Sequence, residues 1–316
     1  MKPFAFVFPG QGSQAVGMLD AWGDHPAVTQ TLAEASDALG EDLGRLIKEG
    51  PKEALGLTTN TQPVMLVAGI AAYRAWLAEG GAEPAVVAGH SLGEYTALVA
   101  AGALALADAA PLVRFRARAM QEAVPVGAGG MAAILGLDAQ KVIEGCAEAV
   151  RTFGANTAEA VEAANFNDPA QTVIAGSKAA VDKACEVLKA MGAKRALPLP
   201  VSAPFHSSLM KPAADKLRER LAQVSLQPPR FPVINNIEVE SESEPQRIRA
   251  ALYEQAFGPV RWVECVRALH ARGAAVILEC GPGKVLAGLV KRIDAGIPAG
   301  AVYDPASLTE AKALLQ

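Results

Sequence analysis

The stretch Ala85-Val86-Val87-Ala88-Gly89-His90-Ser91-Leu92-Gly93-Glu94 places a serine at the centre of a Gly-x-Ser-x-Gly pattern. The apolar run before it predicts a buried strand, and residues 92–107, rich in alanine and leucine, predict a buried helix. This pattern at a strand-to-helix turn is typical of a nucleophile elbow, which exposes the serine hydroxyl above the sheet. We expect side chains at positions 89 and 93 to crowd the approaching substrate. Ser91 is therefore the candidate nucleophile, and the alternative is a serine that caps a helix.

Composition bounds the class of protein. The chain has 316 residues, of which 51% are hydrophobic, so it can bury one large core, with or without an inserted domain. A net charge of −4 argues against a general nucleic-acid binder. The N-terminal apolar run is too short for a signal peptide, and no stretch is apolar enough to span a membrane. The cysteines lack the spacing of a zinc site or a disulfide framework, so we expect a reducing cytoplasm; they are Cys146, Cys185, Cys265 and Cys280.

The order of elements predicts an α/β domain with an insert. Apolar runs at 4–8, 85–88 and 275–279 alternate with helical stretches such as 62–79, which indicates a parallel sheet. The middle of the chain reads βαββαβ, the order of a ferredoxin-like unit; its expected strands are 131–137, 160–166, 171–175 and 194–199, and its helices 138–151 and 177–191. We therefore expect residues 1–126 and 203–316 to form the large domain and 127–202 the small one.

A serine needs a base to accept its proton, and the chain has four histidines. His90 directly precedes Ser91 and is a poor base, because its side chain points away from its neighbour across the elbow. His25 and His270 lie in surface-like contexts. His206 lies where the chain re-enters the large domain, a place where a cleft would form. Elimination favours His206 as the base.

The oxyanion formed during acyl transfer requires fixed donors. The Leu92 amide at the start of the elbow helix is one, and Gln11, in a glycine-flanked loop after the first strand, is expected to supply the other. A dinucleotide-binding reading of that loop fails, because the next glycine is residue 17 where the motif requires 15.

A predicted helix over 111–124 carries three arginines in an apolar context. Arg114 and Arg118 share one face, and Arg116 points to the other. An inward guanidinium offers a bidentate fork to a substrate carboxylate. An ordinary helix salt bridge is an equal alternative for any one of them.

Five ordered motifs together resemble the malonyl-CoA:acyl carrier protein transacylase family, and the match runs nearly end to end. The motifs are Gly10-Gln11-Gly12-Ser13-Gln14, Gly89-His90-Ser91-Leu92-Gly93-Glu94, Arg116 followed by Met120-Gln121-Glu122-Ala123, Asn165-x-Asn167, and Pro204-Phe205-His206-Ser207. The resemblance implies a large α/β-hydrolase-like domain with a ferredoxin-like insert.

The resemblance also implies catalytic roles. Ser91 matches the acylated nucleophile and His206 its general base, while Gln11 and the Leu92 amide match the oxyanion hole. In this family a backbone carbonyl orients the histidine, and Gln255 is the matching residue.

On the substrate side, Arg116 matches the clamp for the malonyl carboxylate. Gln62 and Asn167 are expected to line the pocket, with His90 beside them. Phe205 before the histidine resembles the malonyl-selecting form of the motif, although Ala203 and Pro204 depart from the modular-synthase pattern, so tolerance of methylmalonyl stays open.

The implied reaction is ping-pong transfer of malonyl from a coenzyme A thioester, as substrate, through the serine to the phosphopantetheine thiol of acyl carrier protein, supplying fatty acid chain elongation. It implies no metal and no bound cofactor, no nucleic-acid or membrane partner, and a monomer. The alternatives are a serine esterase or thioesterase, a polyketide-pathway acyltransferase with broader substrate choice, and a non-catalytic carrier-binding module.

Overall fold

The computed structural model describes residues 1–201 and 203–316. The expected boundary between residues 202 and 203 falls on Ser202, which lies outside the described residues. Among the described helices, none is both long and apolar enough to cross a bilayer. All four cysteines are free thiols.

Five strands form a parallel sheet in the order β7-β2-β1-β8-β9. They are β1 (Phe4–Phe8), β2 (Val86–Gly89), β7 (Val233–Ile234), β8 (Val276–Cys280) and β9 (Ala299–Val302). The helices outside the small sheet are α1 (Pro26–Leu39), α2 (Leu43–Glu49), α3 (Lys52–Gly56), α4 (Thr58–Ala78), α5 (Gly93–Ala100), α6 (Leu106–Glu122), α9 (Lys211–Leu221), α10 (Pro245–Gln255), α11 (Trp262–Ala271), α12 (Val285–Ile293) and α13 (Pro305–Leu314), with short 3-10 turns η1 (Asp20–Trp22) and η2 (Ser208–Met210).

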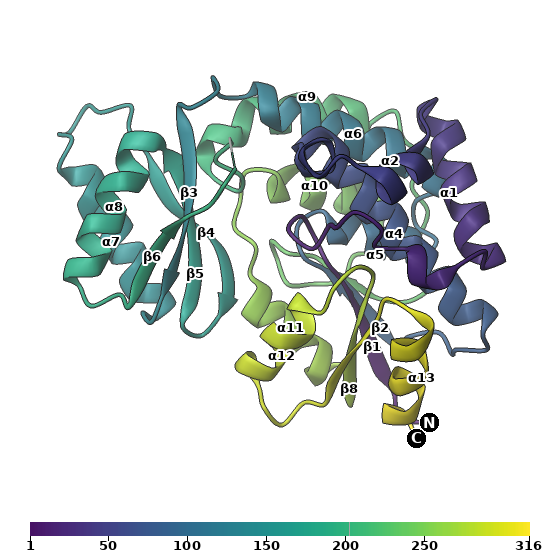
Figure 1. Cartoon of the computed structure of the whole chain (residues 1–316). Coiled ribbons are helices and arrows are strands. Elements are labelled where there is room, and N and C mark those ends of the chain that lie inside the picture. Colours follow the sequence, from purple (N-terminus) through teal and green to yellow (C-terminus); the bar gives the residue numbers. More distant parts are fainter. Residues whose placement is uncertain (202) are drawn as a thin grey trace.

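A second sheet of four antiparallel strands lies to one side of the molecule with two helices (Figure 1). Its elements are β3 (Gly129–Leu135), α7 (Ala139–Arg151), β4 (Val161–Asp168), β5 (Gln171–Ser177), α8 (Lys178–Ala190) and β6 (Arg195–Pro198), and the spatial order of the strands is β4-β5-β3-β6. This is the predicted βαββαβ order. A parallel sheet beside a separate antiparallel sheet confirms the predicted α/β class, and the contiguity of the six elements supports our proposal that 127–202 is an insert.

Strand β1 sits at the centre of the parallel sheet because every one of its residues is apolar and buried. Its aromatic residues, Phe4, Phe6 and Phe8, belong to the core cluster that also holds α4 residues such as Trp76. Ala5 and Val7 point to the other face, where they join the cluster of α11 and α12. Because large and small side chains alternate along β1, its phenylalanines pack against α4 on one face of the sheet and its smaller residues pack against α11 and α12 on the other.

The predicted helix over 92–107 is wrong in extent. Helix α5 ends at Ala100, and α6 begins at Leu106. Gly102 between them has a φ of 74°, a left-handed conformation that ends a helix. Alanine and leucine richness continues across this turn, so composition alone gave no sign of it.

At the elbow between β2 and α5, the backbone segments approach so closely that only glycine fits at positions 89 and 93. A Cβ at Gly89 would lie 1.8 Å from the carbonyl carbon of Gly93, and a Cβ at Gly93 would lie 2.0 Å from the carbonyl oxygen of Phe8. Both glycines are therefore required by the protein's own backbone. We expected side chains at these two positions to crowd the substrate. They would instead clash with the backbone of Gly93 and Phe8.

Gly89→Ala is expected to lower the free energy of unfolding by about 2–3 kcal/mol or more, because the backbone must move to admit the methyl group. Gly56→Ala is the matched control, since a Cβ there meets nothing within 4 Å; its change should stay within about 0.5 kcal/mol. Urea unfolding measures both. Equal stabilities for the two variants would contradict this account of the elbow.

Candidate active site

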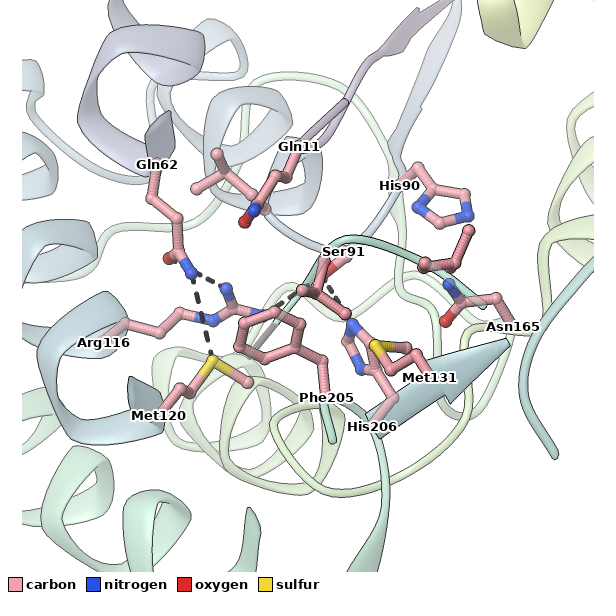
Figure 2. A pocket seen from close by; sticks show the side chains of 13 residues that line it. Gln11, Gln62, His90, Ser91, Arg116, Met120, Met131, Asn165, Phe205 and His206 are labelled. Carbon is pink, nitrogen blue, oxygen red and sulfur yellow. Dashed lines mark hydrogen bonds between the residues drawn. The ribbon is translucent and has the colours of Figure 1, made fainter. Parts of the chain in front are cut away.

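A pocket opens between the carboxyl edge of the parallel sheet and the small sheet (Figure 2). It combines loops after β1 and β2, helices α4 and α6, and strands of the small sheet. Its lining residues are Gln11, Gln62, His90, Ser91, Leu92, Arg116, Met120, Met131, Asn165, Leu199, Val201, Phe205 and His206. Residues far apart in the sequence therefore meet at one hydroxyl group, that of Ser91.

Ser91 and His206 form the central contact. The Ser91 Oγ lies 2.6 Å from His206 Nε2. Both residues have a positive φ, 52° and 61°, a strained conformation worth of order 1–3 kcal/mol each that clusters at functional sites. The structure thus brings the predicted nucleophile and base into hydrogen-bond distance.

The orientation of His206 comes from backbone carbonyls. His206 Nδ1 lies 2.9 Å from the Gln255 carbonyl oxygen and 3.2 Å from that of Gly258. A ring nitrogen facing carbonyl oxygens must carry the proton, which leaves Nε2 as the acceptor for the serine O–H. Burial, together with the Arg116 charge, lowers the pKa of His206 to about 3. The imidazole is therefore neutral near pH 7 and able to accept a proton.

Arg116 lies on the other side of the nucleophile, and only 2% of its surface is exposed. Its guanidinium donates to Gln62 Oε1 at 2.9 Å, Gln255 Oε1 at 3.0 Å and Ser91 Oγ at 3.2 Å. Burial lowers its pKa. Within the described part of the chain no carboxylate forms an ion pair with Arg116, so a buried cation faces the pocket without an anion in contact.

The other two arginines of the helix follow the predicted division of faces. Arg114 is buried on the opposite side and pairs with Glu41 at 2.6 Å. Arg118 is exposed. The salt-bridge alternative therefore describes Arg114, while Arg116 lies in the pocket.

The side chain of Gln255 makes further contacts in the site, besides the contact of its backbone carbonyl with His206. Its side-chain Nε2 donates to the Ser91 carbonyl oxygen at 2.8 Å and to Glu94 Oε2 at 3.1 Å. Its Oε1 accepts from Arg116. Glu94 is buried, and burial raises its pKa to about 7. One fully buried residue therefore contacts His206 through its backbone carbonyl, and Ser91 and Arg116 through its side-chain amide.

Both residues expected to supply the oxyanion donors, Gln11 and Leu92, line the pocket. Leu92 precedes α5 as its N-cap, where backbone N–H groups lack partners inside the helix and favour negative charge. The Gln11 side chain lies near the serine (Figure 2), and its Nε2 is 3.4 Å from Thr58 Oγ1. A Cβ on Gly10 would lie 2.6 Å from the His90 carbonyl oxygen, so the loop packs directly on the elbow.

Gln62, Phe205 and His90 line the pocket, whereas Asn167 does not. Asn167 Oδ1 instead contacts His90 Nε2 at 2.8 Å, and burial lowers the pKa of that histidine. Asn165 takes the lining position. In a regular strand residues two apart share a face, but β4 shifts register at Ala163/Asn165 and again at Phe166/Asp168, which separates the two asparagines.

Several lining residues were not predicted from the sequence. Four of them, Met120, Met131, Leu199 and Val201, are apolar, and the chain offers no signal that separates such residues from ordinary core. Across residues 1–201 and 203–316, no group of three or more His, Cys, Asp or Glu side chains is arranged to hold a metal ion.

Comparison with known proteins gives a consistent result. The model of the acyl transferase domain family matches residues 5–295. The malonyl CoA-acyl carrier protein transacylase of Escherichia coli K12 is 51% identical over 98% of this chain and 99% of its own length. The crystal structure of an acyl-carrier-protein S-malonyltransferase from Burkholderia pseudomallei 1710b superposes with a TM-score of 0.95 at 65% identity, covering 98% of this chain and 99% of that one. A malonyl-transacylase solved in complex with its type II PKS acyl-carrier protein gives a TM-score of 0.94 at 49% identity, covering 98% and 99%.

The lowered pKa of His206 predicts a pH dependence of stability. The ordinary histidine value is 6.5 and the folded value about 3. Between these values the unfolded chain binds the proton and the folded protein does not, so stability falls as the pH drops below 6.5. His206→Asn removes the group and tolerates a positive φ. From pH 7 to pH 5, the stability of the wild type relative to this variant should drop by about 2 kcal/mol in urea unfolding; a difference that does not vary with pH contradicts the neutral buried base.

Proposed function

Because the chain belongs to the acyl transferase family, and matches malonyl-CoA–acyl carrier protein transacylases over nearly its whole length, we propose that Ser91 carries malonyl from coenzyme A to an acyl carrier protein. The enzyme transfers a malonyl group from malonyl-CoA to the phosphopantetheine thiol of the carrier, supplying fatty acid chain elongation. The 2.6 Å contact of Ser91 with a neutral, carbonyl-oriented histidine, beside a buried arginine, is the observation that carries the residue assignments.

In the first half-reaction, Ser91 Oγ attacks the thioester carbonyl while His206 Nε2 accepts the hydroxyl proton. The Leu92 N–H and Gln11 meet the oxyanion of the tetrahedral intermediate. When the intermediate collapses, the carbon–sulfur bond breaks and the proton on His206 goes to the coenzyme A thiolate. Malonyl-serine remains.

The second half-reaction repeats these steps with the carrier thiol as the nucleophile and Ser91 as the leaving group. The carrier thiol gives its proton to His206 and attacks the malonyl ester, and the proton then returns to Ser91 as the carbon–oxygen bond breaks. Malonyl-carrier leaves, and the serine is regenerated. Every proton transfer uses residues already present, so these steps call for no cofactor besides the coenzyme A thioester itself.

Arg116 supplies the selectivity for a carboxylated acyl group. Its hydrogen bonds go to two amide oxygens and the serine hydroxyl, and its Nε has no hydrogen-bond partner among the described residues. A buried cation without a paired anion favours binding of a carboxylate at bidentate distance. A simple esterase has no use for such a group, which is why we favour the transacylase.

We place the enzyme in the cytoplasm, where its four free thiols stay reduced. Phe205 lines the acyl pocket and is our candidate for exclusion of a branched malonyl group. The second candidate role is supply of malonyl groups for polyketide synthesis, because one solved relative was captured in complex with a type II PKS acyl-carrier protein.

Incubation with malonyl-CoA, followed by acid quench and intact-mass analysis, should show one malonyl increment, mapped to the peptide that contains Ser91. Added holo-carrier protein should discharge it. Ser91→Ala should show no increment. Release of free malonate without a transferable adduct would identify a hydrolase and overturn the proposal; carrier binding with no adduct in the wild type would identify a binding module.

Arg116→Ala should lower kcat/KM for malonyl transfer by about 100-fold, as expected for loss of charge-assisted hydrogen bonds worth roughly 3 kcal/mol. Acetyl transfer from acetyl-CoA has no carboxylate to lose, so it should fall far less. The ratio of the two kcat/KM values is the measurement. Equal losses for both substrates would show that Arg116 maintains the structure of the site and does not clamp the carboxylate.

A further inference from the structure

Asn236 is the second residue after β7 and is completely buried next to Ser91. Its Oδ1 accepts from the Ser91 N–H at 2.8 Å, and its Nδ2 donates to the Gly89 carbonyl oxygen at 2.8 Å. One amide thus spans the elbow from the last residue of β2 to the nucleophile. No other described side chain hydrogen-bonds to the Ser91 N–H.

The backbone of the same residue holds the far side of the turn. The Asn236 N–H donates to Glu94 Oε2 at 2.9 Å, and Glu94 lies in the first turn of α5. Glu94 Oε2 also accepts from Gln255 Nε2, whose amide in turn contacts Arg116. Asn236 therefore connects strand, nucleophile and helix through two of its own groups and one buried acid.

These contacts match what the elbow needs. Ser91 has a φ of 52°, which a serine adopts only where its surroundings impose it. Relaxation of that conformation would swing Oγ away from His206, 2.6 Å distant, and would turn the neighbouring Leu92 N–H as well. The Asn236 side chain opposes this relaxation, because it accepts from the Ser91 N–H and donates to the Gly89 carbonyl oxygen.

We propose that Asn236 is a positioning residue that holds Ser91 in its reactive conformation; the inference rests on the proposed role of Ser91. Asn236 does not line the pocket and contacts neither Arg116 nor Gln62. Its loss should therefore reduce the rate of acylation and leave the binding of malonyl-CoA largely unchanged.

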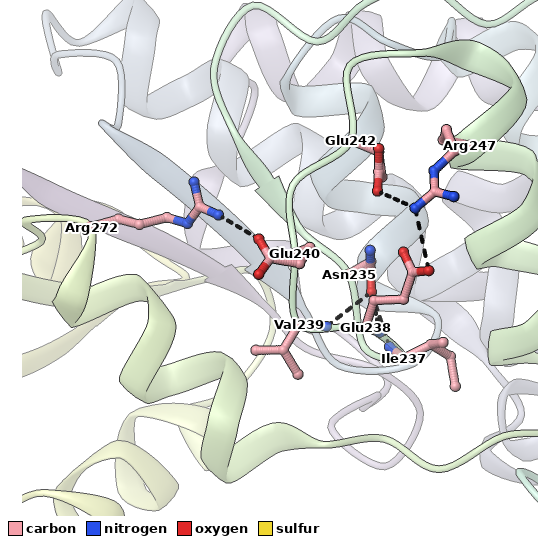
Figure 3. Close-up of polar contacts among 8 residues, drawn as sticks. All are labelled: Asn235, Ile237, Glu238, Val239, Glu240, Glu242, Arg247 and Arg272. Carbon is pink, nitrogen blue, oxygen red and sulfur yellow. Dashed lines mark hydrogen bonds and ion pairs between the residues drawn. The ribbon is translucent and has the colours of Figure 1, made fainter.

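The adjacent Asn235 is a matched control (Figure 3). It is also buried at the end of β7, but its Oδ1 accepts from the N–H groups of Ile237, Glu238 and Val239 at 3.1, 2.7 and 3.2 Å. It orders the loop that turns away from the elbow, where Val239 has a φ of 62°. Removing the Asn235 side chain costs three part-buried hydrogen bonds at the same strand end, and none of them involves Gly89 or Ser91.

The experiment compares single-turnover acylation by malonyl-CoA in the wild type, Asn236→Ala and Asn235→Ala, by rapid quench and intact mass. Both variants should lose thermal stability. Asn236→Ala should lower the saturating acylation rate about 10- to 100-fold, the range expected for a misplacement near 1 Å, with the half-saturating malonyl-CoA concentration within about threefold of wild type. Asn235→Ala should retain at least about half of the wild-type rate.

Equal rates for the two alanine variants, or an effect of Asn236→Ala confined to the half-saturating concentration, would overturn the inference. In either case acylation of the wild type would leave the proposed function intact. A wild type that forms no malonyl-serine would instead remove the proposed function itself.

Asn236→Asp gives an independent test if the alanine variant does not fold. A protonated aspartic acid keeps one donor and one acceptor in the shape of the amide, whereas the carboxylate places a second acceptor against the Gly89 carbonyl. The titratable groups that face it are Glu94 from α5 and Cys265 from α11, 4.0 Å from Nδ2. The acylation rate of the variant divided by that of the wild type should rise as the pH is lowered from 8.5 to 6. A ratio that does not rise would overturn the role of the Gly89 contact.

Discussion

The contact between Gly89 and Gly93 is the constraint on which the site depends. A missing side chain at each position lets β2 turn into α5 within three residues, and that turn forces Ser91 into a left-handed conformation. The Ser91 hydroxyl then faces His206, and the next residue, Leu92, lines the same pocket. The proposed nucleophile and the proposed oxyanion donor therefore both belong to this one turn of the backbone.

The second organising element is a cation held in the interior without a contacting anion. Arg116 is solvated by the side chains of Gln62 and Gln255, so its charge is stabilised but not neutralised. The same charge, together with burial, keeps His206 unprotonated. In the proposed mechanism, a substrate carboxylate at Arg116 offsets the cation that helps to hold the imidazole neutral, so proton uptake by His206 becomes easier when that substrate is bound.

The local parts of this arrangement could be predicted from the sequence, because they depend on neighbours along the chain. The elbow, the opposed faces of Arg114 and Arg116 and the βαββαβ order all follow from short-range spacing. The parts that failed depend on three-dimensional detail. The break at Gly102 lies within a uniformly helix-forming composition. The irregular register of β4 places Asn165, and not Asn167, in the pocket lining. Asn236 contacts residues that are more than a hundred positions away in the sequence.

The strand order of the large sheet also constrains how the protein is made. Strand β1 is synthesised before the other strands of its sheet, yet in the finished sheet it lies between β2 and β8, and the Lys2 N–H donates to the Leu315 carbonyl oxygen. The small sheet is contiguous in sequence and can form as soon as it emerges. The parallel sheet cannot form around β1 until β8 has been synthesised, so this apolar strand lacks one of its two partner strands while the residues between them are made.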